Sequence, residues 1–148
     1  MPLLGSEAGR TRPRLQSGVL AYRRLETGET EVLLVKKLHS QNWGIPKGKA
    51  EPHLSLDANA AKEAFEEAGV KGRIQQHATV TYRATKRIYG QKIVIEVFVY
   101  LLEVTETAKK WPEKAKRDFK WASPREAATL LREPALVELC LRLAEIPA

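Results

Sequence analysis

Three glutamates in the middle of the chain form the group of residues with the clearest chemical potential. Glu63 lies three residues before Glu66 and four before Glu67, in an Ala- and Glu-rich segment typical of a helix. At these spacings the carboxylates share one helix face, where like charges repel. Lys62 can pair with Glu66, but one lysine does not balance three carboxylates. A hard divalent cation would, because Mg²⁺ prefers oxygen ligands and usually takes one or two carboxylates together with substrate phosphates.

A loop rich in Gly and Pro, residues 42–49, precedes these glutamates. Gly48 allows close approach of the backbone to a metal, and its carbonyl is a candidate ligand. Lys47 is a candidate contact for a phosphate. A bound metal would lower the pKa of a water molecule, and a carboxylate would remove its proton. The pattern predicts metal-dependent hydrolysis of a phosphoanhydride bond, whereas the glutamates alone would indicate an ordinary solvated helix face.

The elements that must position these residues alternate between short strands and helices. The segment 55–68 predicts a helix that ends at Gly69 and buries an alanine-rich stripe. Ser123, Pro124 and Glu126 together mark the start of a later helix. Antiparallel strands with separated helices predict an α/β or α+β sandwich. The predicted strands are 17–23, 31–35, 75–83, 93–104 and 118–121, and a last helical piece is expected from Pro134 to Ala144.

The composition fits one globular domain. The chain has 148 residues, 43% of them hydrophobic, and no apolar run reaches the roughly 20 residues needed to cross a bilayer. We expect a flexible tail at residues 1–14, a single domain at 15–148 and no membrane partner. Cys140 is the only cysteine, which excludes a disulfide framework and a thiolate zinc site. A reducing cytoplasm is therefore expected, with an Arg-bearing targeting tail as the lesser alternative.

The net charge of +7 favours a polyanionic ligand, although a merely solvated basic surface explains it equally well. We expect a phosphorylated small-molecule substrate. No motif for RNA recognition is present in the sequence, so no stable nucleic-acid partner is expected, and monomer and homodimer both stay open. The candidate substrate-binding cations are Lys47, Arg14, Arg23, Lys36 and Arg87.

The segment from Gly48 to Val70 resembles the Nudix box, G-x5-E-x7-R-E-U-x-E-E-x-G-U, where U is aliphatic. The resemblance implies that Glu63, Glu67 and the Gly48 carbonyl bind the metal, Mg²⁺ or else Mn²⁺. It implies that Glu66 is a further ligand or the proton acceptor, so that all three glutamates are catalytic. It also implies an α/β/α sandwich around a mixed β-sheet. The matching positions are Gly48, Glu63, Ala64, Glu66, Glu67, Gly69 and Val70.

Two positions depart from that pattern. Leu54 stands where the box has its first glutamate, and Lys62 where it has arginine. In the family these two residues hold the loop and helix together. Their joint replacement predicts that one ion pair is lost as a unit, which avoids an uncompensated charge. We therefore expect packing, with Leu54 turned inward, to hold the loop. A catalytically weak or inactive ligand-binding module is the alternative.

Segments outside the box resemble one branch of the family, the diphosphoinositol polyphosphate and diadenosine polyphosphate phosphohydrolases. The segments are QSGVLAYRR, EVLLVKK, NWGIPKGKAEP, EEAGVKG and RDFKWASPREAATLL. The resemblance implies hydrolysis of a phosphoanhydride in a dinucleoside polyphosphate or a diphosphoinositol polyphosphate. An RNA 5′-pyrophosphohydrolase and a nucleoside triphosphate pyrophosphatase are the other enzymes that it leaves open.

Overall fold

Two long strands that are far apart in the sequence form the centre of the sheet. Strand β1 (Arg14–Arg24) runs parallel to β6 (Gln91–Thr107), and β2 (Thr30–Lys37) returns antiparallel beside β1. The sheet of this computed structural model, which describes residues 12–146, has the order β4-β6-β1-β2-β7. The remaining strands are β3 (Lys47–Lys49) beside β1, β4 (Val70–Ile74) and β5 (Val80–Ile88) beside β6, and β7 (Arg117–Ala122) beside β2.

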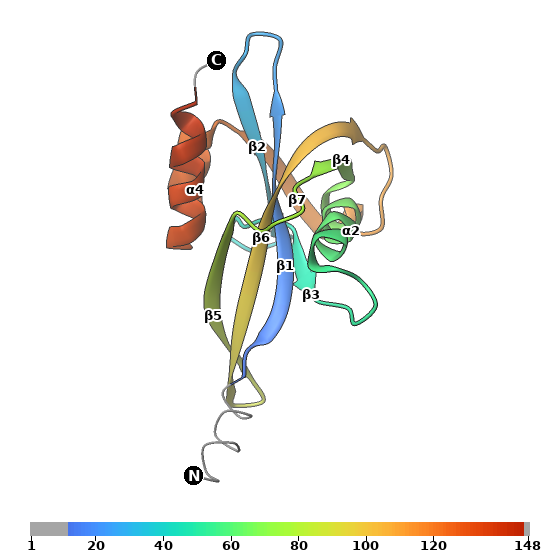
Figure 1. The fold of residues 1–148 in the computed structure, drawn as a ribbon, viewed down its shortest axis with the longest axis vertical. Helices are drawn as coiled ribbons and strands as arrows, with labels where there is room; N and C mark the ends of the chain where they lie inside the picture. Colours follow the sequence, from blue (N-terminus) through green and yellow to red (C-terminus); the bar gives the residue numbers. More distant parts are fainter. Residues whose placement is uncertain (1–11, 147–148) are drawn as a thin grey trace.

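Helices cover both faces of this sheet (Figure 1). Helix α2 (Leu56–Ala68) packs its alanines against one face, in a core that includes Val19 and Leu33. Helices α3 (Pro124–Leu130) and α4 (Pro134–Ala144) lie on the other face, where Leu20 and Cys140 are buried. The sheet contains both parallel and antiparallel pairs, so the predicted α/β/α sandwich with a mixed sheet is confirmed.

Helix α2 has the predicted bounds because its capping residues fix them. Ser55 caps its first turn, where its hydroxyl accepts a hydrogen bond from the Ala58 N–H. Gly69 ends it in the left-handed conformation, with φ of 69°, and its N–H donates to the Phe65 carbonyl. Within the helix, the buried Asn59 amide donates to the Ser17 hydroxyl at 2.9 Å. These contacts fix the position of the helix relative to β1.

Three details of the structure differ from the sequence prediction. The strand expected at 75–83 begins at Val80, and β4 comes before it. Strand β4 is short and mostly exposed, so it lacks the alternating pattern that predicts a strand, and its pairing with β6 defines it. Strand β3 lies within the predicted loop, where β1 pairs with it.

Two further predictions concern the first residues of the chain and a membrane-spanning helix. The tail was predicted over residues 1–14, of which residues 1–11 lie outside the described residues, and Arg14 is already the first residue of β1. Within residues 12–146, no helix is both long and apolar enough to span a membrane.

Candidate functional site

Glu63 and Glu67 lie on the part of α2 next to β3, whereas Glu66 lines a cavity together with Phe65 and Pro112. The Glu67 side chain is only 5% exposed, and that of Glu63 only 13%, whereas Glu66 is more accessible. Gly48 lies directly beneath the Glu63 carboxylate, because a Cβ atom added at Gly48 would stand 2.3 Å from Glu63 Cδ and Oε1. Any larger residue at this position would have to displace the carboxylate. The structure thus brings together Gly48, Glu63 and Glu67, the three metal ligands that the sequence predicted.

Burial changes the ionisation of these carboxylates. Burial is the main cause that raises the pKa of Glu67, to about 8, and the charge of the Glu63 carboxylate adds to the rise. The charge of Arg117 acts in the opposite direction. The pKa of Glu63 is raised by burial and then by Glu66, while a hydrogen bond with Glu67 opposes the rise. Glu63 and Glu67 are therefore neighbouring carboxylates that favour holding a proton when no cation is present.

This donor set fits a hard divalent cation. Two adjacent, buried carboxylates that resist ionisation together would be stabilised in their charged form by a positive ion between them. Within the described part of the chain, no three His, Cys, Asp or Glu side chains converge into a complete metal cage. Mg²⁺ does not need one, since it commonly keeps waters and takes substrate phosphates as ligands. The chain supplies a partial coordination sphere of oxygen atoms.

A cation from the far end of the chain also reaches this site. Arg117, at the start of β7, lies 3.7 Å from Glu67 Oε2 and 2.9 Å from Glu113 Oε1. The Glu113 N–H donates to the Glu66 carbonyl at 2.9 Å, which ties this segment to α2. Residues 113 and 117 are about fifty positions from the box, and no spacing in the sequence indicates that they would meet it.

An ion pair holds the loop to the helix, contrary to the sequence prediction. Lys62 Nζ lies 2.9 Å from Glu51 Oε2 and 3.0 Å from Glu66 Oε2. Leu54 is only half-buried, so the expectation that packing of Leu54 replaces the ion pair was wrong. The carboxylate comes from a position three residues earlier than the box pattern requires. A fixed pattern could not find it, because a flexible loop can present an acid from either position.

Lys47 connects the glutamates to a neighbouring group of cations. Burial is the main cause that lowers the pKa of Lys47, followed by the positive charge of Lys86, while Glu67 acts in the opposite direction. Lys47 is therefore near enough to the Glu67 carboxylate and the Lys86 ammonium for both charges to act on it, in opposite directions. An anionic group beside Lys47 would relieve the repulsion between the two lysines.

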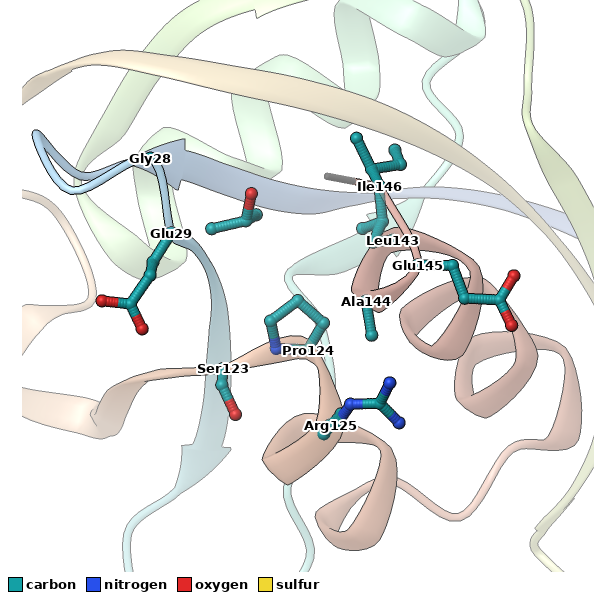
Figure 2. A pocket seen from close by; sticks show the side chains of 10 residues that line it. Gly28, Glu29, Ser123, Pro124, Arg125, Leu143, Ala144, Glu145 and Ile146 are labelled. Atoms are coloured by element: carbon teal, nitrogen blue, oxygen red, sulfur yellow. The ribbon is translucent and has the colours of Figure 1, made fainter. Parts of the chain in front are cut away.

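Glu66 lines a cavity of about 520 Å³ and Arg23 one of about 210 Å³. Two others, of about 400 and 670 Å³, differ in whether a predicted site residue lines them. The larger opens where β1 begins, beside the end of β3 and the β5–β6 hairpin, and Arg14 lines it. Lys49 and Lys86 line it as well, and neither was among the principal candidates. The smaller lies between the β1–β2 turn, the start of α3 and the end of α4 (Figure 2), and none of the predicted site residues lines it.

The other three predicted substrate-binding cations have partners of their own. Arg23 forms an ion pair with Glu31 at 2.7 Å and stacks over Trp121. Lys36 lies 3.2 Å from Asp118. Arg87 donates to the Gly90 carbonyl within the β5–β6 hairpin. The structure does not bring these three cations into the group formed by Lys47, Lys49 and Lys86.

The chain is similar to a family model, to known protein sequences and to solved structures. The family model described as the NUDIX domain matches residues 14–139. Nudix hydrolase 12, mitochondrial, of Arabidopsis thaliana is 30% identical over 89% of this chain and 76% of its own length. Diphosphoinositol polyphosphate phosphohydrolase 3-alpha of Mus musculus is 31% identical over 70% of this chain, which spans 62% of that relative. The Caenorhabditis elegans Ap4A hydrolase, in a binary complex, superimposes with a TM-score of 0.64 at 20% identity, over 88% of this chain and 95% of that one.

Proposed function

Because this chain belongs to the Nudix hydrolase family, whose members act on pyrophosphate bonds and generally use divalent metal ions, we propose that it hydrolyses a phosphoanhydride bond with Mg²⁺, or with Mn²⁺. The observation that carries the proposal is the contact of the Glu63 carboxylate with Gly48 beside the buried Glu67. Two neighbouring buried carboxylates of raised pKa would be stabilised in their ionised form by a cation between them.

Each residue has a role that follows from its surroundings. Glu63, Glu67 and the Gly48 carbonyl would hold the ion, which when bound polarises phosphate oxygens and lowers the pKa of a bound water. Glu66 is more accessible and its charge is held by Lys62 at 3.0 Å, so it is available to orient or deprotonate the attacking water. Lys47 is placed to meet a phosphate oxygen, and Arg14 a phosphate farther along the substrate.

We propose a dinucleoside polyphosphate or a diphosphoinositol polyphosphate as the substrate. The support is the cationic lining of the cavity beside β3, together with the activities for which the mouse relative and the nematode structural neighbour are named. A cytoplasmic location is part of the same proposal, and imaging of the full-length protein in cells tests it. No observation favours a particular oligomeric state.

The test is a panel of substrates assayed with Mg²⁺, with Mn²⁺ and with a chelator. The panel contains diadenosine polyphosphates, a diphosphoinositol polyphosphate, ADP-ribose, nucleoside triphosphates and 5′-triphosphorylated RNA. Glu67→Gln should remove turnover, whereas Glu106→Gln, a matched change at an exposed end of β6, should leave it intact. Absence of metal-dependent turnover on every member of the panel would refute the proposal.

A ligand-binding module without catalysis is the second candidate. It is favoured by the incomplete metal cage within residues 12–146 and by the ion pair between Glu67 and Arg117. Calorimetry with non-hydrolysable analogues separates the two candidates. A sensor would bind them equally well with and without metal, and equally well in Glu67→Gln.

A further inference from the structure

The β5–β6 hairpin extends beyond the helices that cover the two faces of the sheet (Figure 1). Its two-residue turn consists of Tyr89 and Gly90, because Ile88 pairs with Gln91. The side chain of Tyr89 is fully exposed, and Ile88 beside it is 38% exposed. The Tyr89 ring therefore gains no packing free energy from the described part of the chain.

The backbone at the tip of this hairpin also disfavours a tyrosine. The φ angle of Tyr89 is 50° and that of Gly90 is 78°, so both central residues of the turn are in the left-handed region. Such turns favour Asn, Asp or Gly at the first central position, whereas a bulky side chain costs free energy there. Neither the turn nor the core explains the tyrosine, and a contact with a partner outside the chain does.

The strands behind this tip carry positive charge only. From the first residue of β5 to Lys92, the hairpin contains four cations and no acidic residue. Arg87 and Lys92 pair directly across the two strands, where like charges repel. The next acid along β6, Glu96, lies 3.6 Å from Arg83, so it does not balance that pair. Arg14, at the start of β1, adds a cation at the same end of the sheet, and an external anionic surface would relieve this repulsion.

The cations lie on both faces of the hairpin. Successive residues of a strand point to opposite faces, so Lys86 lies on one face and Arg87, with its partner Lys92, on the other. A nucleic-acid strand along one face would leave the charges of the other face without partners. It would also find a single aromatic ring at the tip, whereas surfaces for single strands stack successive bases on several rings. An anionic plane that the tip approaches end-on meets the cations of both faces.

We propose that the tip of the β5–β6 hairpin binds the surface of an anionic phospholipid membrane. In this arrangement Tyr89 and Ile88 enter the headgroup region, while Lys86, Arg87 and Lys92 meet the negative groups of the lipids. Tyrosine suits this position because its ring is apolar and its hydroxyl stays hydrated. The cytoplasmic leaflet supplies the negative surface potential. Such a contact needs no spanning helix, so it adds a peripheral membrane partner that the sequence did not lead us to expect.

Sedimentation of the full chain with lipid vesicles tests the proposal. Vesicles of phosphatidylcholine alone are compared with vesicles that contain equal parts of phosphatidylcholine and phosphatidylserine. Wild type should bind only the second kind, and binding should weaken as the salt concentration is raised. Lys92→Glu should weaken binding at least about 5-fold. Lys110→Glu, the same change of charge at an exposed residue beyond the opposite end of β6, should have a much smaller effect.

Substitutions of Tyr89 separate the contribution of the ring from that of the fold. Tyr89→Asn removes the ring and keeps the turn, because Asn accepts the left-handed conformation. The melting temperature should therefore be unchanged or higher, while vesicle binding falls several-fold. Tyr89→Trp should retain binding, since Trp is also suited to the headgroup region. Hydrolysis of a soluble substrate should not change in either variant, because Tyr89 lines none of the cavities named above.

Four results would overturn the proposal. Equal binding to the two kinds of vesicle, or to neither, would exclude an anionic membrane as the partner. Equal loss in Lys92→Glu and Lys110→Glu would reduce the effect to net charge. Full vesicle binding by Tyr89→Asn would show that the tip is not the contact. Tighter binding to a single-stranded RNA than to the anionic vesicles, lost in Tyr89→Asn, would assign the hairpin to nucleic acid instead.

Discussion

The substitution Glu67→Gln is expected to stabilise the metal-free protein at alkaline pH while it abolishes hydrolysis. Burial, with Glu63 adding to it, raises the pKa of Glu67 from its ordinary 4.5 to about 8. A rise of that size corresponds to roughly 5 kcal/mol of unfavourable free energy when the buried carboxylate is forced to ionise. Gln keeps the shape and the hydrogen-bonding capacity of the protonated acid without a charge.

The direction of the pH dependence follows from the raised pKa. Below pH 4.5 Glu67 is protonated in the folded and the unfolded protein, so its contribution to stability is fully present there. As the pH rises from 4.5 to about 8, only the unfolded chain releases the proton, and the free energy of unfolding falls. Arg117 limits the loss, and it keeps its 2.9 Å contact with Glu113 in the variant.

Urea unfolding in the presence of a chelator measures the effect at pH 5, 7 and 9. Between pH 5 and pH 9 the free energy of unfolding of wild type should fall by several kcal/mol, roughly 3 to 5 kcal/mol at the upper limit. The Glu67→Gln variant should largely lack this fall. Glu106→Gln is the control, because its side chain is exposed at the end of β6. Added Mg²⁺ should raise the stability of wild type by mass action and leave that of Glu67→Gln unchanged.

Two results would refute this reasoning. One is a Glu67→Gln variant that is less stable than wild type at pH 9 without metal, which would mean that the Glu67 charge stabilises the fold through Arg117. The other is Mg²⁺-induced stabilisation of equal size in both proteins, which would place the ion away from Glu67.

Three further predictions concern residues around the same helix and in the core. Gly48→Ala forces the flexible Glu63 carboxylate aside. Stability should therefore change by less than about 1 kcal/mol, while kcat/KM falls at least about 100-fold. A fully active variant would contradict the contact between Gly48 and the Glu63 carboxylate. A double-mutant cycle on Glu51→Gln and Lys62→Gln should give a small favourable coupling energy that weakens with salt, because both side chains are exposed to solvent; zero coupling at low salt would exclude the ion pair. Burial raises the pKa of the Cys140 thiol to about 11, so a thiol reagent at pH 8 should label Cys140 only when urea unfolds the protein. Rapid labelling of the native protein would show that the α4 face opens.

Helix α2 and its glutamates are the part that could be predicted from the sequence. A Ser cap, a stop at glycine and carboxylates at spacings of three and four are local features, and the helix has the predicted bounds for that reason. Strands β1 and β2, expected at 17–23 and 31–35, have the same explanation, because each contains a contiguous apolar run. The resemblance to the Nudix box also depended on a contiguous segment.

The predictions that failed involve contacts that residue spacing alone does not define. The sequence showed that Leu54 and Lys62 break the box pattern, and we expected the loop to lose its ion pair. The fold instead brings Glu51 within 2.9 Å of Lys62. Likewise β4 is a strand because β6 pairs with it, and its own residues do not alternate.

The sequence by itself determined the family, the sandwich and the three glutamates on one helix face, because these depend on local spacing and on the pattern of apolar residues. Only the tertiary structure decided which residues surround them. The pairing of β7 with β2 brings Arg117 to Glu67, and the pairings of β1 with β3 and β6 put Gln16, Lys49 and Ile95 around one cavity. The burial that raises the pKa of Glu67 is likewise a property of the packed chain, because the residue type alone does not determine it.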